Sequence, residues 1–152
     1  MESDIYRDRI LEHHRFPRHK GRLNRASMST EGTNASCGDK VTLTLKWDGK
    51  KLANARFHGE GCALSLASCD ILLEHVISMT ATKIATLTPG DMYDLLGVTV
   101  NPGRSACALL CLKTLTRVAG EYAASFEESH VDEEDTSAVP SPESFGDDEY
   151  SQ

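Results

Sequence analysis

This sequence has no long hydrophobic run, no secretory leader and few aromatic residues, and each absence argues against a class of protein. No apolar stretch approaches the roughly 20 residues that cross a bilayer, so we expect no membrane span. The first segment, MESDIYRDRI, is charged and lacks the apolar region of a signal peptide. Aromatic residues make up 6% of the chain, and the basic stretch HHRFPRHKGR contains only one, which disfavours a nucleic-acid-binding protein.

The five cysteines lack the usual signatures of disulfide-rich and thiol-redox proteins. Their number is odd, and no two of them form a C-x-x-C pair. Without a secretory leader we expect a cytoplasmic chain, in which thiols stay reduced and clustered cysteines favour metal binding or catalysis. A metal-free thiol redox protein is therefore a disfavoured alternative.

The net charge of −7 conceals two parts of opposite sign. Residues 127–152 contain ten acidic residues and no Lys or Arg, whereas residues 1–126 contain 16 basic and 13 acidic residues, a net charge of +3. The acidic part has too few apolar residues to offset the entropy of ordering. We therefore expect one domain over 1–126 and a disordered acidic tail over 127–152, whose removal from 128 onward leaves fold and metal binding intact. Shielding of the basic domain by this tail is an open alternative.

Hydrophobic periodicity predicts an α+β domain, with helices packed on one face of a small antiparallel sheet of about three strands. KVTLTLKW and KLANARFH read as strands, and the intervening DGK indicates a hairpin turn. A third strand is possible near residues 25–35. Helices are expected over four segments: SDIYRDRILEHH, the stretch from Gly61–Cys62 onward, TPGDMYDLLG with Thr88 as its N-cap, and the chain from about Ser105 to Phe126.

Three cysteines stand where a metal ion could be held. Cys37 lies in the polar loop TNASCGDK, two residues before Asp39, and Cys62 and Cys107 fall in the first turns of predicted helices. Helix N-termini favour thiolates, and three sulfur donors with one oxygen suit tetrahedral Zn²⁺ or one end of an iron–sulfur cluster. The spacing fits no standard zinc finger, so three unrelated thiols are the alternative on spacing alone.

The other two cysteines are expected in the core. Cys69 follows Cys62 by seven residues, about 10 Å along a helix, and cannot share its metal ion. Cys111 lies one turn after Cys107, where a buried small side chain is favoured over a substitute ligand. His58 is expected to have a structural role at the end of the sheet.

Four segments together resemble the IscU/NifU N-terminal/SufU family of iron–sulfur cluster assembly proteins: ILEHHRFPRHKGRL, NASCGDKVTLTL, ARFHGEGCALSLASCD and LLGVTVNPGRSACALLCL. The likeness covers about residues 4–123, with the segments in the family's order. Family members carry N-P-x-C-G-D, then G-x-G-C before a Ser/Ala-rich helix, then a third cysteine at the start of the last helix. Cys37, Asp39, Cys62 and Cys107 fall on those positions, and Ala35 stands where the family often has proline.

The resemblance is closest to the SufU-type branch. IscU-type scaffolds have a histidine directly before the third cysteine, where this chain has Ala106. SufU-type members instead have an arginine three positions before that cysteine, and Arg104 matches it. The stretch between the second and third cysteines is shorter than is usual in SufU-type proteins and is closer to IscU in length. Arg104, Gly38 and Gly61 are the expected supporting residues of the site.

The resemblance implies a function in sulfur transfer. SufU-type proteins bind Zn²⁺, accept persulfide sulfur from a SufS-like, pyridoxal-phosphate-dependent cysteine desulfurase, and pass it to a downstream scaffold or apo-protein. By this resemblance the metal ligands are Cys37, Asp39, Cys62 and Cys107, and no stand-alone activity, nucleic acid or membrane partner is expected. Two alternatives are open: an IscU-type scaffold that holds iron or a transient [2Fe–2S] cluster on the same ligands, and a structural zinc module.

Cys37 is the expected sulfur acceptor because it lies on a loop. Cys62 and Cys107 are expected to be anchored by helices packed into the core, so moving either one would strain the packing. Gly32 and Gly38 flank the Cys37 loop and are expected to permit its motion.

Overall fold

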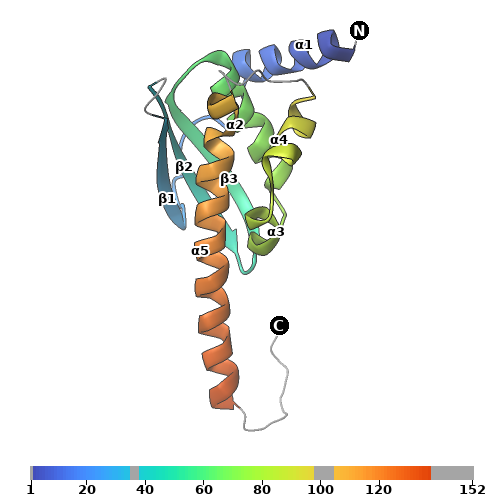
Figure 1. Ribbon diagram of the computed structural model, residues 1–152. Helices are drawn as coiled ribbons and strands as arrows, with labels where there is room; N and C mark the ends of the chain where they lie inside the picture. Colours follow the sequence, from blue (N-terminus) through green and yellow to red (C-terminus); the bar gives the residue numbers. More distant parts are fainter. Residues whose placement is uncertain (1, 35–37, 98–104, 138–152) are drawn as a thin grey trace.

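The computed structural model describes residues 2–34, 38–97 and 105–137 (Figure 1). It contains one antiparallel sheet of three strands in the order β1-β2-β3, which confirms the predicted α+β class. The strands are β1 (Met28–Asn34), β2 (Asp39–Asp48) and β3 (Lys51–Glu60), and the helices are α1 (Glu2–Arg15), α2 (Ala63–Val76), α3 (Ala81–Ala85), α4 (Pro89–Leu96) and α5 (Ser105–Ser137). No helix among these residues is long and apolar enough to cross a membrane.

The predicted hairpin is confirmed by the pairing of β2 with β3. Asp48 pairs with Lys51, so Gly49 and Lys50 form the turn, and Gly49 has the positive φ of 62° that such tight turns need. The four alternating apolar residues of β2 are all buried on one face of the sheet: Val41, Leu43, Leu45 and Trp47. The third strand anticipated near residues 25–35 is β1, which pairs antiparallel with β2.

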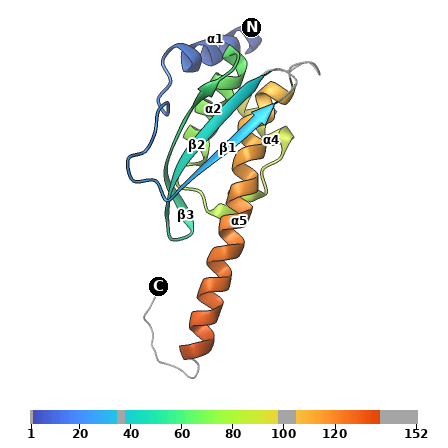
Figure 2. The same cartoon turned by 90° about the vertical axis from the view of Figure 1, so that its left-hand side faces the viewer.

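Helices α2 and α5 cover the apolar face of the sheet (Figures 1 and 2). Helix α5 approaches β1 most closely at Gly32, where a Cβ atom would lie 1.9 Å from Oγ1 of Thr114. Gly32 is therefore a packing residue inside a strand. The expectation that it acts as a hinge of the Cys37 loop was wrong, because strand pairing extends to Asn34 and the helix packs directly on the glycine.

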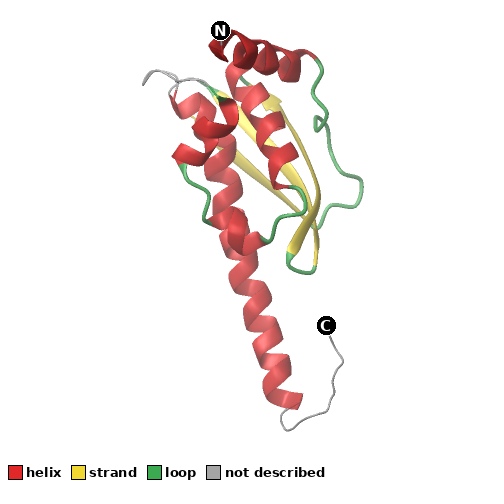
Figure 3. Ribbon diagram, turned by 90° about the vertical axis from the view of Figure 1, so that its right-hand side faces the viewer, coloured by secondary structure: helices red, strands yellow, loops and turns green. Residues whose placement is uncertain are grey.

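A segment without helix or strand crosses the opposite face of the sheet. Its first residues pair with the free edge of β3: the N–H of Gly21 donates to the carbonyl of Phe57 at 2.7 Å. The N–H of Leu23 then donates to Oγ1 of Thr44 at 3.1 Å, and the N–H of Ser27 to the carbonyl of Leu45 at 2.7 Å. Figure 3 shows this segment on the side of the sheet away from α2 and α5. We call residues 20–27 the strap.

The last helix is longer than predicted. It begins at Ser105 as expected, but it continues past Phe126 to Ser137, into the acidic part of the chain that was expected to be disordered. Adding residues to an existing helix is far easier than starting one, and the core-packed turns before Phe126 supply the start. Residues 138–152 lie outside the described part of the chain. The five-residue helix α3 was not expected either.

At the hairpin end of the sheet, α5 is attached by aromatic side chains. The rings of Trp47 and Tyr122 stack with their centroids 4.4 Å apart and an interplanar angle of 8°. The Tyr122 hydroxyl donates to the carbonyl of Gly49 at 2.6 Å. This contact fixes where α5 leaves the body of the domain, because the helix continues beyond it (Figure 1).

A buried carboxylate attaches α1 and the following turn to α2. Asp70 is fully buried, and its oxygens lie 2.6 Å from Nδ1 of His13, 2.9 Å from the N–H of Arg18 and 2.8 Å from the N–H of His19. Since a buried carboxylate is stable only when hydrogen-bonded, these three donors explain how an acidic residue is accommodated in the apolar helix α2.

We expect Asp70→Ala to lower the free energy of unfolding by about 2–4 kcal/mol, because it removes the acceptor of Nδ1 of His13 and of two backbone N–H groups. Glu74→Ala is the matched control: Glu74 lies one turn later on α2, is 43% exposed and ion-pairs with Arg18, so a loss of less than ~1 kcal/mol is expected. Urea denaturation of both variants measures the difference. Equal losses would contradict the role given to Asp70.

Candidate metal centre

The strand register brings the start of β2 and the end of β3 together at one end of the sheet. Lys40, the second residue of β2, pairs with Glu60, the last residue of β3. Asp39 begins β2, and only Gly61 and Cys62 separate β3 from α2. Asp39 and Cys62 therefore lie side by side although 23 positions separate them in the sequence.

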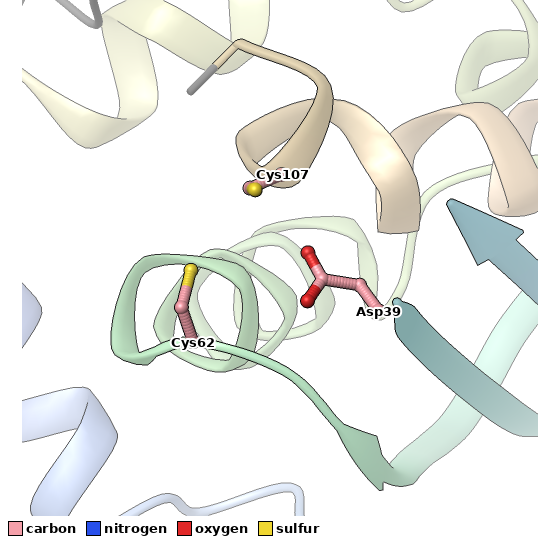
Figure 4. A group of neighbouring side chains, drawn as sticks. All are labelled: Asp39, Cys62 and Cys107. Carbon is pink, nitrogen blue, oxygen red and sulfur yellow. The ribbon is translucent and has the colours of Figure 1, made fainter. Parts of the chain in front are cut away.

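The first turn of α5 completes this cluster. One carboxylate oxygen of Asp39 and the Sγ atoms of Cys62 and Cys107 all lie within 4.8 Å of one another. Figure 4 shows the three side chains converging from β2, from the start of α2 and from α5. Asp39 is 4% and Cys107 5% exposed, whereas Cys62 is half-buried. Cys62 is thus the most exposed of the three ligands.

Gly61 makes room for the carboxylate. A Cβ atom at this position would lie 3.1 Å from Oδ1 of Asp39 and 3.1 Å from Oγ of Ser65. A larger residue would therefore require the carboxylate or the first turn of α2 to shift by a few tenths of an ångström. The supporting role expected for Gly61 stays a prediction, and the same contact involves Ser65, whose part in this packing no sequence motif indicated.

The donors present fit a zinc ion. Tetrahedral Zn²⁺ with Zn–S bonds of ~2.3 Å and Zn–O bonds of ~2.0 Å has ligand atoms roughly 3.5–3.8 Å apart, and the three donors here are already within 4.8 Å. Two of the ligands stand at helix N-termini, where free N–H groups favour negative charge. Cys62 is the N-cap of α2 and its side chain makes no capping hydrogen bond. The same set could hold iron, since thiolates are also ligands of iron–sulfur clusters.

Two expected site residues, Cys37 and Arg104, lie outside the described part of the chain. Gly38, between Cys37 and Asp39, has a φ of 73° that favours glycine, and no atom outside its chain neighbours lies within 4 Å of where its Cβ would be.

The remaining thiols are separate from the cluster. Cys69 and Cys111 are each 2% exposed and belong to the hydrophobic core between α2 and α5. Burial raises the pKa of the Cys69 thiol well above its usual value, and the neighbouring thiol of Cys111 and the carboxylate of Asp70 raise it further. Cys69 is therefore kept protonated, which agrees with the core role expected of it. His58 lies on β3, and its Nε2 is buried without a hydrogen-bond partner.

The sequence and the fold of the chain match those of known proteins. A model of the NifU-like N-terminal domain matches residues 5–128. The chain belongs to this family. Among relatives of this NifU-like domain, the zinc-dependent sulfurtransferase SufU of Bacillus subtilis is 33% identical over 130 residues, covering 74% of this chain and 88% of that protein. The iron–sulfur cluster assembly scaffold protein IscU of Thermotoga maritima is 33% identical over 127 residues, covering 73% of this chain and 89% of that protein.

Solved structures agree with this assignment of the NifU-like domain. An iron–sulfur cluster assembly scaffold protein for the SUF system from Fervidobacterium islandicum AW-1 superposes with a TM-score of 0.63 at 30% identity, covering 71% of this chain and 91% of that one. A NifU-like N-terminal protein from Brucella abortus has a TM-score of 0.62 at 22% identity, covering 76% of this chain and 92% of that one, and supports the fold. The resemblance stated from the sequence is thereby confirmed.

We expect Gly61→Ala to weaken metal binding by between about 10- and 100-fold, because the added methyl group displaces the Asp39 carboxylate. Gly90→Ala on α4 is the control, since its Cβ would meet only Oγ1 of Thr88 at 3.6 Å, an ordinary contact. Competition with a chromophoric zinc chelator measures both affinities, and circular dichroism checks the fold. Unchanged affinity in Gly61→Ala would contradict this role.

Proposed function

We propose that this NifU-like domain is a zinc-dependent sulfur acceptor of the SufU type. It takes persulfide sulfur from a pyridoxal-phosphate-dependent cysteine desulfurase and passes it to downstream iron–sulfur assembly, in a reducing cytoplasm where thiols persist. The observation that carries the proposal is the cluster of Asp39, Cys62 and Cys107, which includes no histidine among the described residues. The position before Cys107, where IscU-type scaffolds have histidine, is an exposed alanine, Ala106.

Each residue of the cluster has a distinct part in this function. Zn²⁺, when bound, keeps cysteine ligands deprotonated and shielded until a partner displaces one of them. Cys62 and Cys107 are held in place by α2 and α5, whose other faces form the core. Asp39 is held by its pairing with Asn34 of β1 and by the space that Gly61 leaves. These three residues would hold a zinc ion while the Cys37 thiolate reacts, and an oxygen ligand is adequate for zinc.

The transfer step is a thiol exchange at Cys37. Its thiolate attacks the outer sulfur of the desulfurase persulfide, forming a new S–S bond at Cys37. The S–S bond within the desulfurase persulfide breaks, and the desulfurase cysteine leaves as a thiolate. The outer sulfur moves at unchanged oxidation level, so the step needs no separate oxidant or reductant.

An IscU-type scaffold is the second candidate, favoured by the equal identity of 33% to the Thermotoga maritima IscU. Anaerobic reconstitution with iron and sulfide separates the two. A [2Fe–2S] cluster that displaces zinc, is seen by absorption and Mössbauer spectroscopy, and can be transferred to an apo-ferredoxin would favour the scaffold. Zinc that stays bound, together with stimulation of the desulfurase, would favour the sulfur acceptor.

A purely structural zinc module is the third candidate, and the position of the cluster argues against it. The hydrophobic core of the described residues includes Leu43, Leu72 and Leu115, all fully buried, and none of the three ligands. Such a core does not require the metal ion, so chelation should leave the secondary structure intact. Unfolding on chelation, seen by circular dichroism, would support the structural module.

We expect one tightly bound Zn²⁺ per chain in protein purified without oxygen. Cys62→Ser/Cys107→Ser should lose it, because one oxygen ligand and one thiolate cannot hold zinc tightly. The matched control is Cys69→Ala/Cys111→Ala, which removes the same number of thiols from the same two helices outside the cluster. Mass spectrometry of metals measures the stoichiometry. Zinc near zero in the wild type, or retained in the first variant, would refute the ligand set.

We expect the persulfide to form on Cys37 when the protein reacts with desulfurase and cysteine. Peptide mass spectrometry should find an added mass of ~32 Da, one sulfur atom, on the peptide that contains Cys37. Cys37→Ser should abolish transfer. Cys111→Ala should retain it, because that thiol lies in the core. Label on Cys62 or Cys107 in the wild type, or full transfer by Cys37→Ser, would assign the acceptor role elsewhere.

A further inference from the structure

The face of the sheet opposite the helices is positively charged. Two sequence segments contribute to it: the strap, and the alternate residues of β2 and β3 that point away from the core. We call these residues the basic face: Lys20, Arg22, Arg25, Lys46 and Arg56. All are exposed except Arg56, which is half-buried and whose guanidinium donates to the carbonyl of Lys20 at 3.1 Å.

Little negative charge on the described surface balances the basic face. Residues 13–30, which include the strap, contain no Asp or Glu. Lys40, on the same side of the sheet, is already paired with Glu31 at 3.2 Å. No ion pair joins any of the five basic side chains to a carboxylate within the described ranges, although Asp48 and Glu60 lie on the same two strands. Like charges held together in this way favour an anionic occupant.

We propose that the occupant is the acidic C-terminal segment of the same chain. Residues 138–152 contain Glu143, Asp147, Asp148 and Glu149 and no Lys or Arg. This segment follows the acidic end of α5. The region without acidic residues, 13–30, and the region without Lys or Arg, 127–152, thus lie far apart in the sequence. Charge complementarity between them is the basis of the proposal.

The chain is long enough for this contact. Helix α5 passes the hairpin turn at Tyr122, which bonds Gly49, and Ser137 ends the helix about 22 Å further on, at 1.5 Å per residue. Residues 138–152 span up to roughly 50 Å when extended. They can therefore return past the hairpin turn to the near end of the basic face, at Lys46. The strap reaches the same place, because the N–H of Ser27 donates to the carbonyl of Leu45, the residue before Lys46.

The tethered segment acts as an internal competitor. A segment on a short linker reaches an effective concentration in the millimolar range, enough to occupy a weak electrostatic site at low salt. An acidic surface of another protein would have to displace it. The contact should weaken as salt rises, because exposed charges are screened over ~10 Å at 0.1 M ionic strength.

Zero-length carbodiimide crosslinking of the full chain at low salt tests the proposal. Mapped by mass spectrometry, crosslinks should join Lys46 to residues 147–149, with at least fivefold less product at 0.5 M NaCl, where screening acts over ~4 Å (about 3 Å at 1 M). Lys83 and Lys113, exposed lysines on the helical side, are the controls and should crosslink at least fivefold less. An equal mixture of ¹⁴N- and ¹⁵N-labelled protein separates contacts within a chain from contacts between copies.

A second measurement keeps the test independent of crosslinking chemistry. Asp147→Asn/Asp148→Asn/Glu149→Gln should raise affinity for heparin, used as an anionic probe, by about three- to tenfold (~0.7–1.4 kcal/mol), and Arg22→Glu/Arg25→Glu should abolish that gain. Crosslinks only between copies would make a second chain the occupant. Equal crosslinking of all lysines, or heparin affinity unchanged by the neutralised segment, would refute the proposal.

Discussion

The register of the β2–β3 hairpin is the constraint on which the metal centre depends. Because Lys40 is paired with Glu60, the first residue of β2 and the residues that follow β3 meet at one edge of the sheet. A one-residue slip would turn Asp39 to the other face and bury the polar side chains of β2. The apolar alternation of β2 and the tight turn at Gly49 both fix this register. The packing of the core and the geometry of the site thus have the same cause.

Much of this could be read from the sequence, because the decisive signals are local. The alternation from Val41 to Trp47, the turn residues after it and the Thr88 capping box each determine structure within a few residues. The ligand set was harder, since its spacing resembles no standard zinc site. It became convincing only through the family likeness, and the structure then brought Asp39, Cys62 and Cys107 together.

The features that sequence reasoning did not find depend on contacts between distant segments. Gly32 looked like a loop residue, because nothing near it in the sequence shows that Thr114 packs against it. No sequence signal indicated the role of Asp70, because its three donors come from residues more than 50 positions away. The extension of α5 to Ser137 went unpredicted because composition describes average behaviour, whereas a helix already anchored in the core can continue into an unfavourable sequence.

The stacking of Trp47 on Tyr122 has a practical consequence for studying the molecule in solution. Trp47 is the chain's single tryptophan, is 7% exposed, and lies at the far end of β2 from Asp39, a separation of about 26 Å along the strand. Its emission therefore reports whether the hairpin end and α5 are docked. In metal-loaded protein, ultraviolet absorption of metal–thiolate bonds would report the other end of the same strand. Tryptophan emission and metal–thiolate absorption thus report the two ends of one sheet, so the order in which those ends open can be followed in a single unlabelled sample.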